Sequence, residues 1–198
     1  MPQTKVSVFE YAIRSEEEGA AFYSNAARSL PAGPEKDFLA GLAVEESRHA
    51  EVFRQLREKV AKKGVAELFG SAEVSDYLDA VVRGGLFESA RGAVPGGAAP
   101  KTVEDVYAIA IRAERSSILL YGELAGQATD KTARKIFEDL VREEKNHLVR
   151  IVEDSQQFLD RDCVFRSSQG LGGRHPQVAV SRLQQCRHRR DRVFSPEH

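Results

Sequence analysis

The stretches LAVEESRHAEVF (residues 42–53) and LVREEKNHLVRI (residues 140–151) share one pattern. In each, a Glu and a His three positions apart interrupt a series of apolar residues whose spacing alternates between three and four. That spacing is typical of the buried face of an α-helix. The pairs on this face are Glu46 with His49 and Glu144 with His147. Both stretches therefore predict polar groups inside a helical bundle.

The same offset relates other positions of the chain. Adding 98 to the numbers of Glu46 and His49 gives Glu144 and His147, and adding it to Glu16 and Tyr23 gives Glu114 and Tyr121. Glu16 and Glu114 each lie in the middle of an apolar helical face. The chain thus holds a helical hairpin twice, which indicates an internal repeat.

Four helices are predicted from periodicity and from their end signals. We expect them at about residues 7–29, 34–63, 102–126 and 130–159. An acid three positions after Ser7 and after Thr102 indicates a capping box, and Asp130 is a suitable N-cap. Pro34 suits a first helical position, and Gly64 suits a helix end.

The geometry of a hairpin predicts which side chains meet. Glu16 and Glu46 are equally far from the turn at residue 31, and Glu114 and Glu144 are equally far from the turn at residue 129. In antiparallel helices such residues lie at the same height. Packing the two hairpins together therefore brings four Glu and two His to one level of the bundle.

Four buried carboxylates are strongly unfavourable unless cations compensate them. Two divalent ions balance four negative charges, and carboxylate with imidazole suits iron or manganese. One Glu from each of two helices and Glu-x-x-His from the other two is the arrangement of di-metal carboxylate sites in ferritin-like bundles. We therefore predict an all-α, ferritin-like four-helix bundle with a di-metal site. The predicted metal ligands are Glu16, Glu46, His49, Glu114, Glu144 and His147.

Other polar residues near these ligands have less support. Tyr23 and Tyr121 follow Glu16 and Glu114 by two turns, and two interpretations stay open: core aromatics, or hydrogen-bond donors to the site. Four further acids fall off the buried faces and are expected to be solvated: Glu17, Glu18, Glu45 and Glu143.

The domain prediction has three parts. Residues 1–160 form the bundle, and residues 64–101 form a long crossover connection that contains one short helix. Residues 161–198 carry eight arginines against three acids, a net charge of +5, without sustained apolar periodicity. We expect a poorly ordered basic tail there. A basic arm for an acidic partner, or a shift of reading frame, would give the same composition.

Composition excludes several classes of protein. Charged residues make up 30% of the chain but the formal net charge is −1, which argues against a general nucleic-acid binder. No apolar stretch approaches the roughly 20 residues that cross a bilayer, and no secretory signal is evident. Cys163 and Cys186 match neither a zinc pattern nor a disulfide framework. We therefore expect a cytoplasmic protein that binds neither nucleic acid nor membrane.

The chain resembles the rubrerythrin family of the ferritin-like superfamily over about residues 4–160. The resemblance is carried by EEEGAAFY (16–23), LAVEESRHAEVF (42–53), ERSSILLY (114–121) and LVREEKNHLVRI (140–151). It implies a four-helix bundle with a non-haem di-iron site. By the family pattern Glu46 and Glu144 bridge the metals. Glu16 with His49, and Glu114 with His147, complete the ligand set.

Two departures qualify the resemblance, and a third feature bears on haem. Rubrerythrins carry a rubredoxin module with two Cys-x-x-Cys pairs, whereas the two cysteines here are 23 residues apart. The resemblance therefore implies an external electron donor such as a rubredoxin-like protein. The family's extra Glu one turn after the third-helix ligand is Ser117 here, which puts efficient peroxide reduction in doubt. No Met other than Met1 is present to ligate haem, so we expect no haem.

Three functions are consistent with these features. The first is a di-iron oxidoreductase, a homodimer that reduces hydrogen peroxide or oxygen. The second is a ferritin-like iron-binding or ferroxidase protein for iron storage or handling. The third is a structural bundle without metal. The sequence favours the first, and it leaves iron or manganese open as the metal.

Overall fold

The computed structural model describes residues 7–63, 69, 100–168 and 193. Its helices are α1 (Ser7–Ser29), α2 (Pro34–Lys63), α5 (Val103–Gln127) and α6 (Lys131–Ser168), and no strand occurs among the described residues. The predicted all-α class and its four long helices are confirmed. The short helix predicted in the crossover, and the tail beyond residue 168 apart from Val193, lie outside the described residues.

The helix ends follow from local hydrogen bonds. The Asp105 carboxylate accepts from the backbone N–H of Thr102, and the Thr102 hydroxyl accepts from the N–H of Asp105, at 3.0 and 3.1 Å. This reciprocal pair is a capping box with Asp in place of Glu. Asp130 accepts from the N–H of Ala133 at 2.7 Å and so caps α6. The acid near the start of α1, Glu10, instead contacts Arg57 of α2.

Helix α6 is longer than predicted. It ends at Ser168 rather than near residue 159. The predicted end was placed at a change in composition, but residues 160–168 contain neither Gly nor Pro, so nothing in this stretch breaks the helix. Cys163 in this extension is disulfide-bonded, in contrast to the expectation from the cysteine pattern. A disulfide weakens the argument for a reducing compartment, and the cytoplasmic location stays a prediction.

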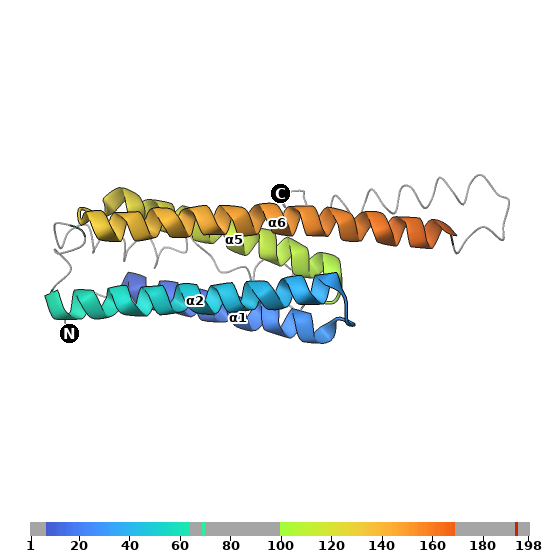
Figure 1. The fold of residues 1–198 in the computed structure, drawn as a ribbon, viewed down its shortest axis with the longest axis horizontal. Helices are drawn as coiled ribbons and strands as arrows, with labels where there is room; N and C mark the ends of the chain where they lie inside the picture. Colours follow the sequence, from blue (N-terminus) through green and yellow to red (C-terminus); the bar gives the residue numbers. More distant parts are fainter. Residues whose placement is uncertain (1–6, 64–68, 70–99, 169–192, 194–198) are drawn as a thin grey trace. The chain divides into compact units, whose positions relative to one another are not determined.

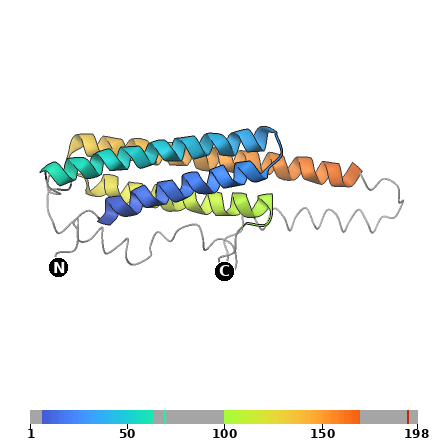
Figure 2. The ribbon, with the colours of Figure 1, turned by 90° about the horizontal axis from the view of Figure 1, so that it is seen from below.

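The chain forms two compact units. The first unit comprises Met1–Ser89 and Ala113–His147, and the second comprises Ala90–Arg112 and Leu148–His198. In the first unit α1 and α2 form a hairpin and lie side by side in both views (Figures 1 and 2). The end of α5 and the start of α6 form the equivalent hairpin. The first unit is thus a bundle of four helical segments.

The core of the first unit consists of the apolar faces read from the sequence. On α2, Leu39 and Leu42 precede the polar pair and Phe53 follows it, and all three are fully buried. Phe53 and Phe137 stack with ring centroids 6.4 Å apart. Apolar side chains therefore lie both before and after the polar level of α2, where they exclude water.

In the second unit, the start of α5 packs against the later part of α6. The Tyr107 hydroxyl donates to the Asp154 carboxylate at 2.5 Å, and the Tyr107 ring lies 6.0 Å from that of Phe158. Within the described helices, no stretch is long and apolar enough to span a bilayer.

Replacing Phe137 by Ala tests the core. We expect a loss of about 3–5 kcal/mol in the free energy of unfolding, because the change leaves a cavity among buried rings. Urea denaturation of the metal-free protein would measure it. Leu119→Ala is the control, since Leu119 is 62% exposed, and it should cost no more than about 0.5 kcal/mol. Equal losses in the two variants would contradict this description of the core.

Candidate metal centre

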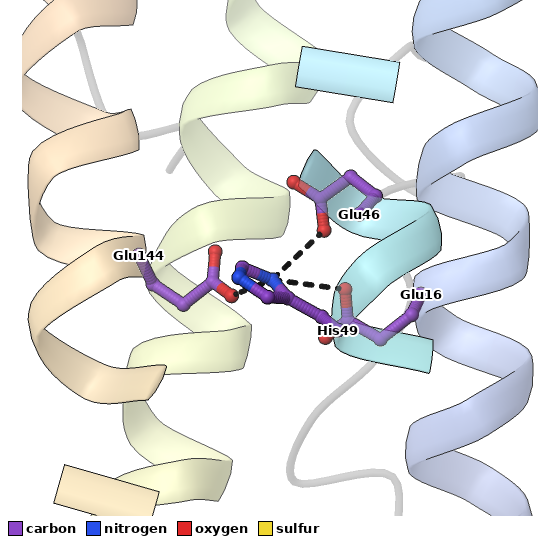
Figure 3. A group of neighbouring side chains, drawn as sticks. All are labelled: Glu16, Glu46, His49 and Glu144. Carbon is purple, nitrogen blue, oxygen red and sulfur yellow. Dashed lines mark ion pairs between the residues drawn. The ribbon is translucent and has the colours of Figure 1, made fainter. Parts of the chain in front are cut away.

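Six polar side chains meet inside the first unit, and they are the six that the sequence predicts as ligands. Two come from α2, two from α6 and one each from α1 and α5, and none is more than 5% exposed: Glu16, Glu46, His49, Glu114, Glu144 and His147. Figure 3 shows four of them pointing toward one another from α1, α2 and α6. The periodicity of the four faces therefore places these side chains correctly.

The six residues form two groups of four. In each group one potential ligand atom from every residue lies within 4.8 Å of the others. The groups are Glu16, Glu46, His49 and Glu144, and Glu46, Glu114, Glu144 and His147. Glu46 and Glu144 belong to both. This sharing is what two neighbouring metal positions with two bridging carboxylates require.

Both imidazoles turn the same nitrogen inward. His49 Nδ1 lies 2.8 Å from Glu144 Oε1 and 3.6 Å from Glu16 Oε2. His147 Nδ1 lies 3.2 Å from Glu144 Oε2 and 3.3 Å from Glu46 Oε1. The two rings stack with their centroids 5.5 Å apart. Each Nδ1 thus faces the carboxylates that a metal ion would share with it.

The outer nitrogen of each histidine contacts an acid of the other hairpin. His49 Nε2 lies 2.8 Å from Glu143 Oε2, and His147 Nε2 lies 2.7 Å from Glu45 Oε2. These two acids were expected to be solvated, and that expectation is wrong, because a Glu side chain is long enough to reach round the helix to its neighbour. Glu45 and Glu143 are themselves 98 residues apart. This repeat was a signal from which their contacts could have been predicted.

These contacts fix the orientation of the rings. An imidazole N–H held by a carboxylate keeps the ring in place and makes its other nitrogen a better metal ligand. Glu45 and Glu143 therefore position the histidines across the two hairpins. Glu17 also has a partner, because it accepts from Arg54, but its side chain is 51% exposed.

The two halves differ in one charged contact. Arg48 donates to the Glu143 carboxylate and its Nη2 lies 3.5 Å from His49 Nε2. The position 98 residues later is Asn146, which is uncharged. Burial opposes ionisation of Glu143, yet His49 and Arg48 outweigh it and lower the pKa of this carboxyl. The arginine beside His49 therefore has an uncharged residue at the equivalent position beside His147.

The two tyrosines also differ. The Tyr23 hydroxyl donates to Glu114 Oε1 at 2.5 Å. The Tyr121 hydroxyl is buried and has no hydrogen-bond partner within the described part of the chain. The same is true of both carboxylate oxygens of Glu16. Of the two open interpretations, the hydrogen bond to the site holds for Tyr23. Tyr121 packs as a core aromatic, with its ring 4.9 Å from that of Phe53.

Without metal the site balances its charge with protons. Burial raises the pKa of Glu16 and Glu114 well above the usual range, and the Glu46 carboxylate adds to this. Burial also opposes ionisation of Glu46 and Glu144. The two imidazoles nevertheless lower the pKa of both groups, and the Glu16 carboxyl lowers that of Glu46 as well.

The histidines show the opposite balance. Burial would lower the pKa of each, yet the surrounding carboxylates raise the pKa of His147 to about 12 and that of His49 far above its usual range. These shifts favour imidazolium at both histidines, ionised Glu46 and Glu144, and protonated Glu16 and Glu114. With that distribution of protons the six side chains carry no net charge.

The donor set fits a pair of divalent ions. Seven buried atoms of these residues make no hydrogen bond of suitable direction among the described residues, although His49 Nδ1 and Glu144 Oε1 are only 2.8 Å apart. They include both inward nitrogens: Glu16 Oε1 and Oε2, Glu46 Oε1, His49 Nδ1, Glu144 Oε1 and Oε2, and His147 Nδ1. Buried polar atoms in folded proteins almost always have a partner. Two ions with four carboxylates and two imidazoles would satisfy these atoms and keep the site neutral.

Comparison with known proteins agrees with this geometry. The family model described as Rubrerythrin matches residues 7–153. Among solved structures, the chain is similar to the crystal structure of a candidate ferritin-like diiron-carboxylate protein from Thermotoga maritima. The two are 25% identical, with a TM-score of 0.54 over 76% of this chain and 93% of the other. No curated protein matches the chain.

Metal binding should release protons. Two ions replace one proton each on Glu16, Glu114, His49 and His147, so we expect about four protons released per two ions near pH 7. Because protons compete for the ligands, affinity should fall as the pH is lowered. Calorimetric titration of the metal-free protein with Mn²⁺, in buffers of different protonation enthalpy, would measure the number. Release of no protons would contradict the protonation pattern.

The tyrosine pair offers a matched test. Tyr23→Phe removes a buried hydrogen bond, so we expect the free energy of unfolding of the metal-free protein to fall by about 1–2 kcal/mol. Tyr121→Phe removes a hydroxyl that has no acceptor among the described residues, so it should change stability by less than about 0.5 kcal/mol or increase it. Urea denaturation of both variants would decide, and equal losses would contradict the difference between the two halves.

Proposed function

Because the chain belongs to the rubrerythrin family, we propose that it is a non-haem di-iron oxidoreductase that reduces hydrogen peroxide or oxygen. The observation that carries the proposal is the sharing of Glu46 and Glu144 by two four-residue groups. One ion would be held by Glu16 and His49, the other by Glu114 and His147, and both by the shared pair. A bound pair of ferrous ions supplies the two electrons that reduce one peroxide, with two protons, to two water molecules.

The chain's own residues provide the surroundings for this chemistry. Glu45 and Glu143 hold the outer nitrogens of the histidines at 2.7 and 2.8 Å and so fix the ligand geometry. Buried apolar side chains such as Leu42 and Phe53 keep bulk water from the site. The Tyr23 hydroxyl oxygen lies 2.5 Å from Glu114 Oε1, to which it donates, and so holds this carboxyl group in place. Burial and the neighbouring carboxylates raise the pKa of Tyr23 well above its usual value, so its hydroxyl keeps its proton.

The partners follow from the same proposal. After each turnover the iron must be reduced again. We propose that an external donor such as a rubredoxin-like protein reduces it. We also propose a homodimer as the working form.

Anaerobic loading with ferrous iron followed by peroxide would test the function. We expect two ferrous ions per chain, and their oxidation by one peroxide should be much faster than that of free ferrous ion. Glu46→Gln should abolish the fast phase, because it removes the charge of a shared ligand. Glu51→Gln on the same helix is the matched control, since this side chain is 56% exposed, and it should behave as the wild type.

Three results would separate the competing functions. Oxidation of the bound iron no faster than that of free ferrous ion would contradict the proposed oxidoreductase function. Retention of many irons per chain in a large shell, measured by metal analysis and light scattering, would favour iron storage instead. Absence of bound metal after expression with ample iron and manganese, together with unchanged stability of Glu46→Ala, would favour a structural bundle.

A further inference from the structure

A glycine stands in the middle of α1, one turn after a predicted ligand. Gly19 follows Glu16 by three residues and is partly exposed. A glycine inside a helix is destabilising relative to alanine, and Gly19 does not have the positive φ that would favour glycine. The helix itself therefore gives no reason for glycine here.

A side chain at this position would contact a shared carboxylate. A Cβ built on Gly19 would lie 3.6 Å from Glu46 Cγ and 3.8 Å from both Glu46 Cδ and Oε2. These are ordinary van der Waals distances, so close packing in the metal-free protein does not require glycine either. A Cβ on Gly122 or Gly41, two other helical glycines, would have no neighbour within 4 Å.

The residue beside Gly19, Glu46, is also the most exposed of the six site residues. Glu46 is 5% exposed, against 0–3% for the other five residues. Its Oε1 is buried and makes no hydrogen bond among the described residues. It belongs to both groups that can hold an ion. Gly19 therefore lies beside the Glu46 carboxylate, which two ions would share.

We propose that the missing side chain at Gly19 leaves open the approach by which a small ligand reaches the metal pair beside Glu46. The inference rests on the proposed function and adds to it a route by which a small ligand, such as hydrogen peroxide or dioxygen, enters. The position 98 residues later is Ser117, also small and partly exposed.

Azide, a linear anion of three atoms, is a suitable probe because its binding to oxidised iron changes the optical spectrum without turnover. The iron-loaded, oxidised protein would be titrated with azide as wild type, Gly19→Leu and Gly122→Leu. We expect Gly19→Leu to bind azide about ten-fold more weakly or worse, because the side chain overpacks the approach. Gly122→Leu makes the same change where no neighbour lies nearby, so its affinity should equal that of the wild type. Iron content should stay at two per chain in all three.

The outcomes separate this inference from the function. Equal azide affinity in Gly19→Leu and the wild type, an equal loss in Gly122→Leu, or no azide binding by the wild type overturns the inference. Failure of peroxide to oxidise the wild-type iron overturns the function and leaves the azide comparison valid. If Gly19→Leu does not retain iron, Gly19→Ala decides. A weaker affinity for azide supports the inference, and an unchanged affinity overturns it.

Discussion

Four carboxylates buried at one level of a helical bundle repel one another, and this repulsion is the constraint on which the rest of the site depends. Apolar side chains before and after this level exclude the water that would otherwise screen them, which increases the cost. The pKa shifts of the metal-free protein favour four compensating protons, two on imidazoles and two on carboxyl groups. Two divalent ions would meet this cost with the same total charge, so loading changes the identity of the cations and not the electrostatic balance.

The sequence predicts which six polar side chains meet, because they recur with the period of a buried helix face. Glu46 and His49 replace apolar residues at positions that must face inward, and the turns at residues 31 and 129 set the height at which the helices meet. The structure brings the six residues together as this argument requires. The same argument failed for Glu45. The helix face of a residue predicts where its side chain begins, but not which neighbouring group its end can reach.

Other differences have equally local causes. The end of α6 was read from a change in composition, whereas a helix ends where a breaking residue or a cap allows it, and residues 160–168 contain neither Gly nor Pro. The roles of Tyr23 and Tyr121 could not be separated by spacing, since both stand two turns after a Glu. Only the geometry shows that one hydroxyl reaches a carboxylate and the other does not. The two halves thus contain the same types of predicted ligand. They differ in the contacts of neighbouring residues such as Arg48.

The crossed contacts of Glu45 with His147 and of Glu143 with His49 have a consequence for the origin of the site. Each hairpin positions the histidine of the other, so a single hairpin contains neither a complete ligand set nor the means to orient its own imidazole. The pairing is isologous, like the interface of a two-fold symmetric dimer. A hairpin that bound a second copy of itself would present the same six residues. The chain therefore carries, in covalent form, the symmetry of a dimer of two hairpins, and the contacts of Arg48 and Tyr23 are two places where the halves differ.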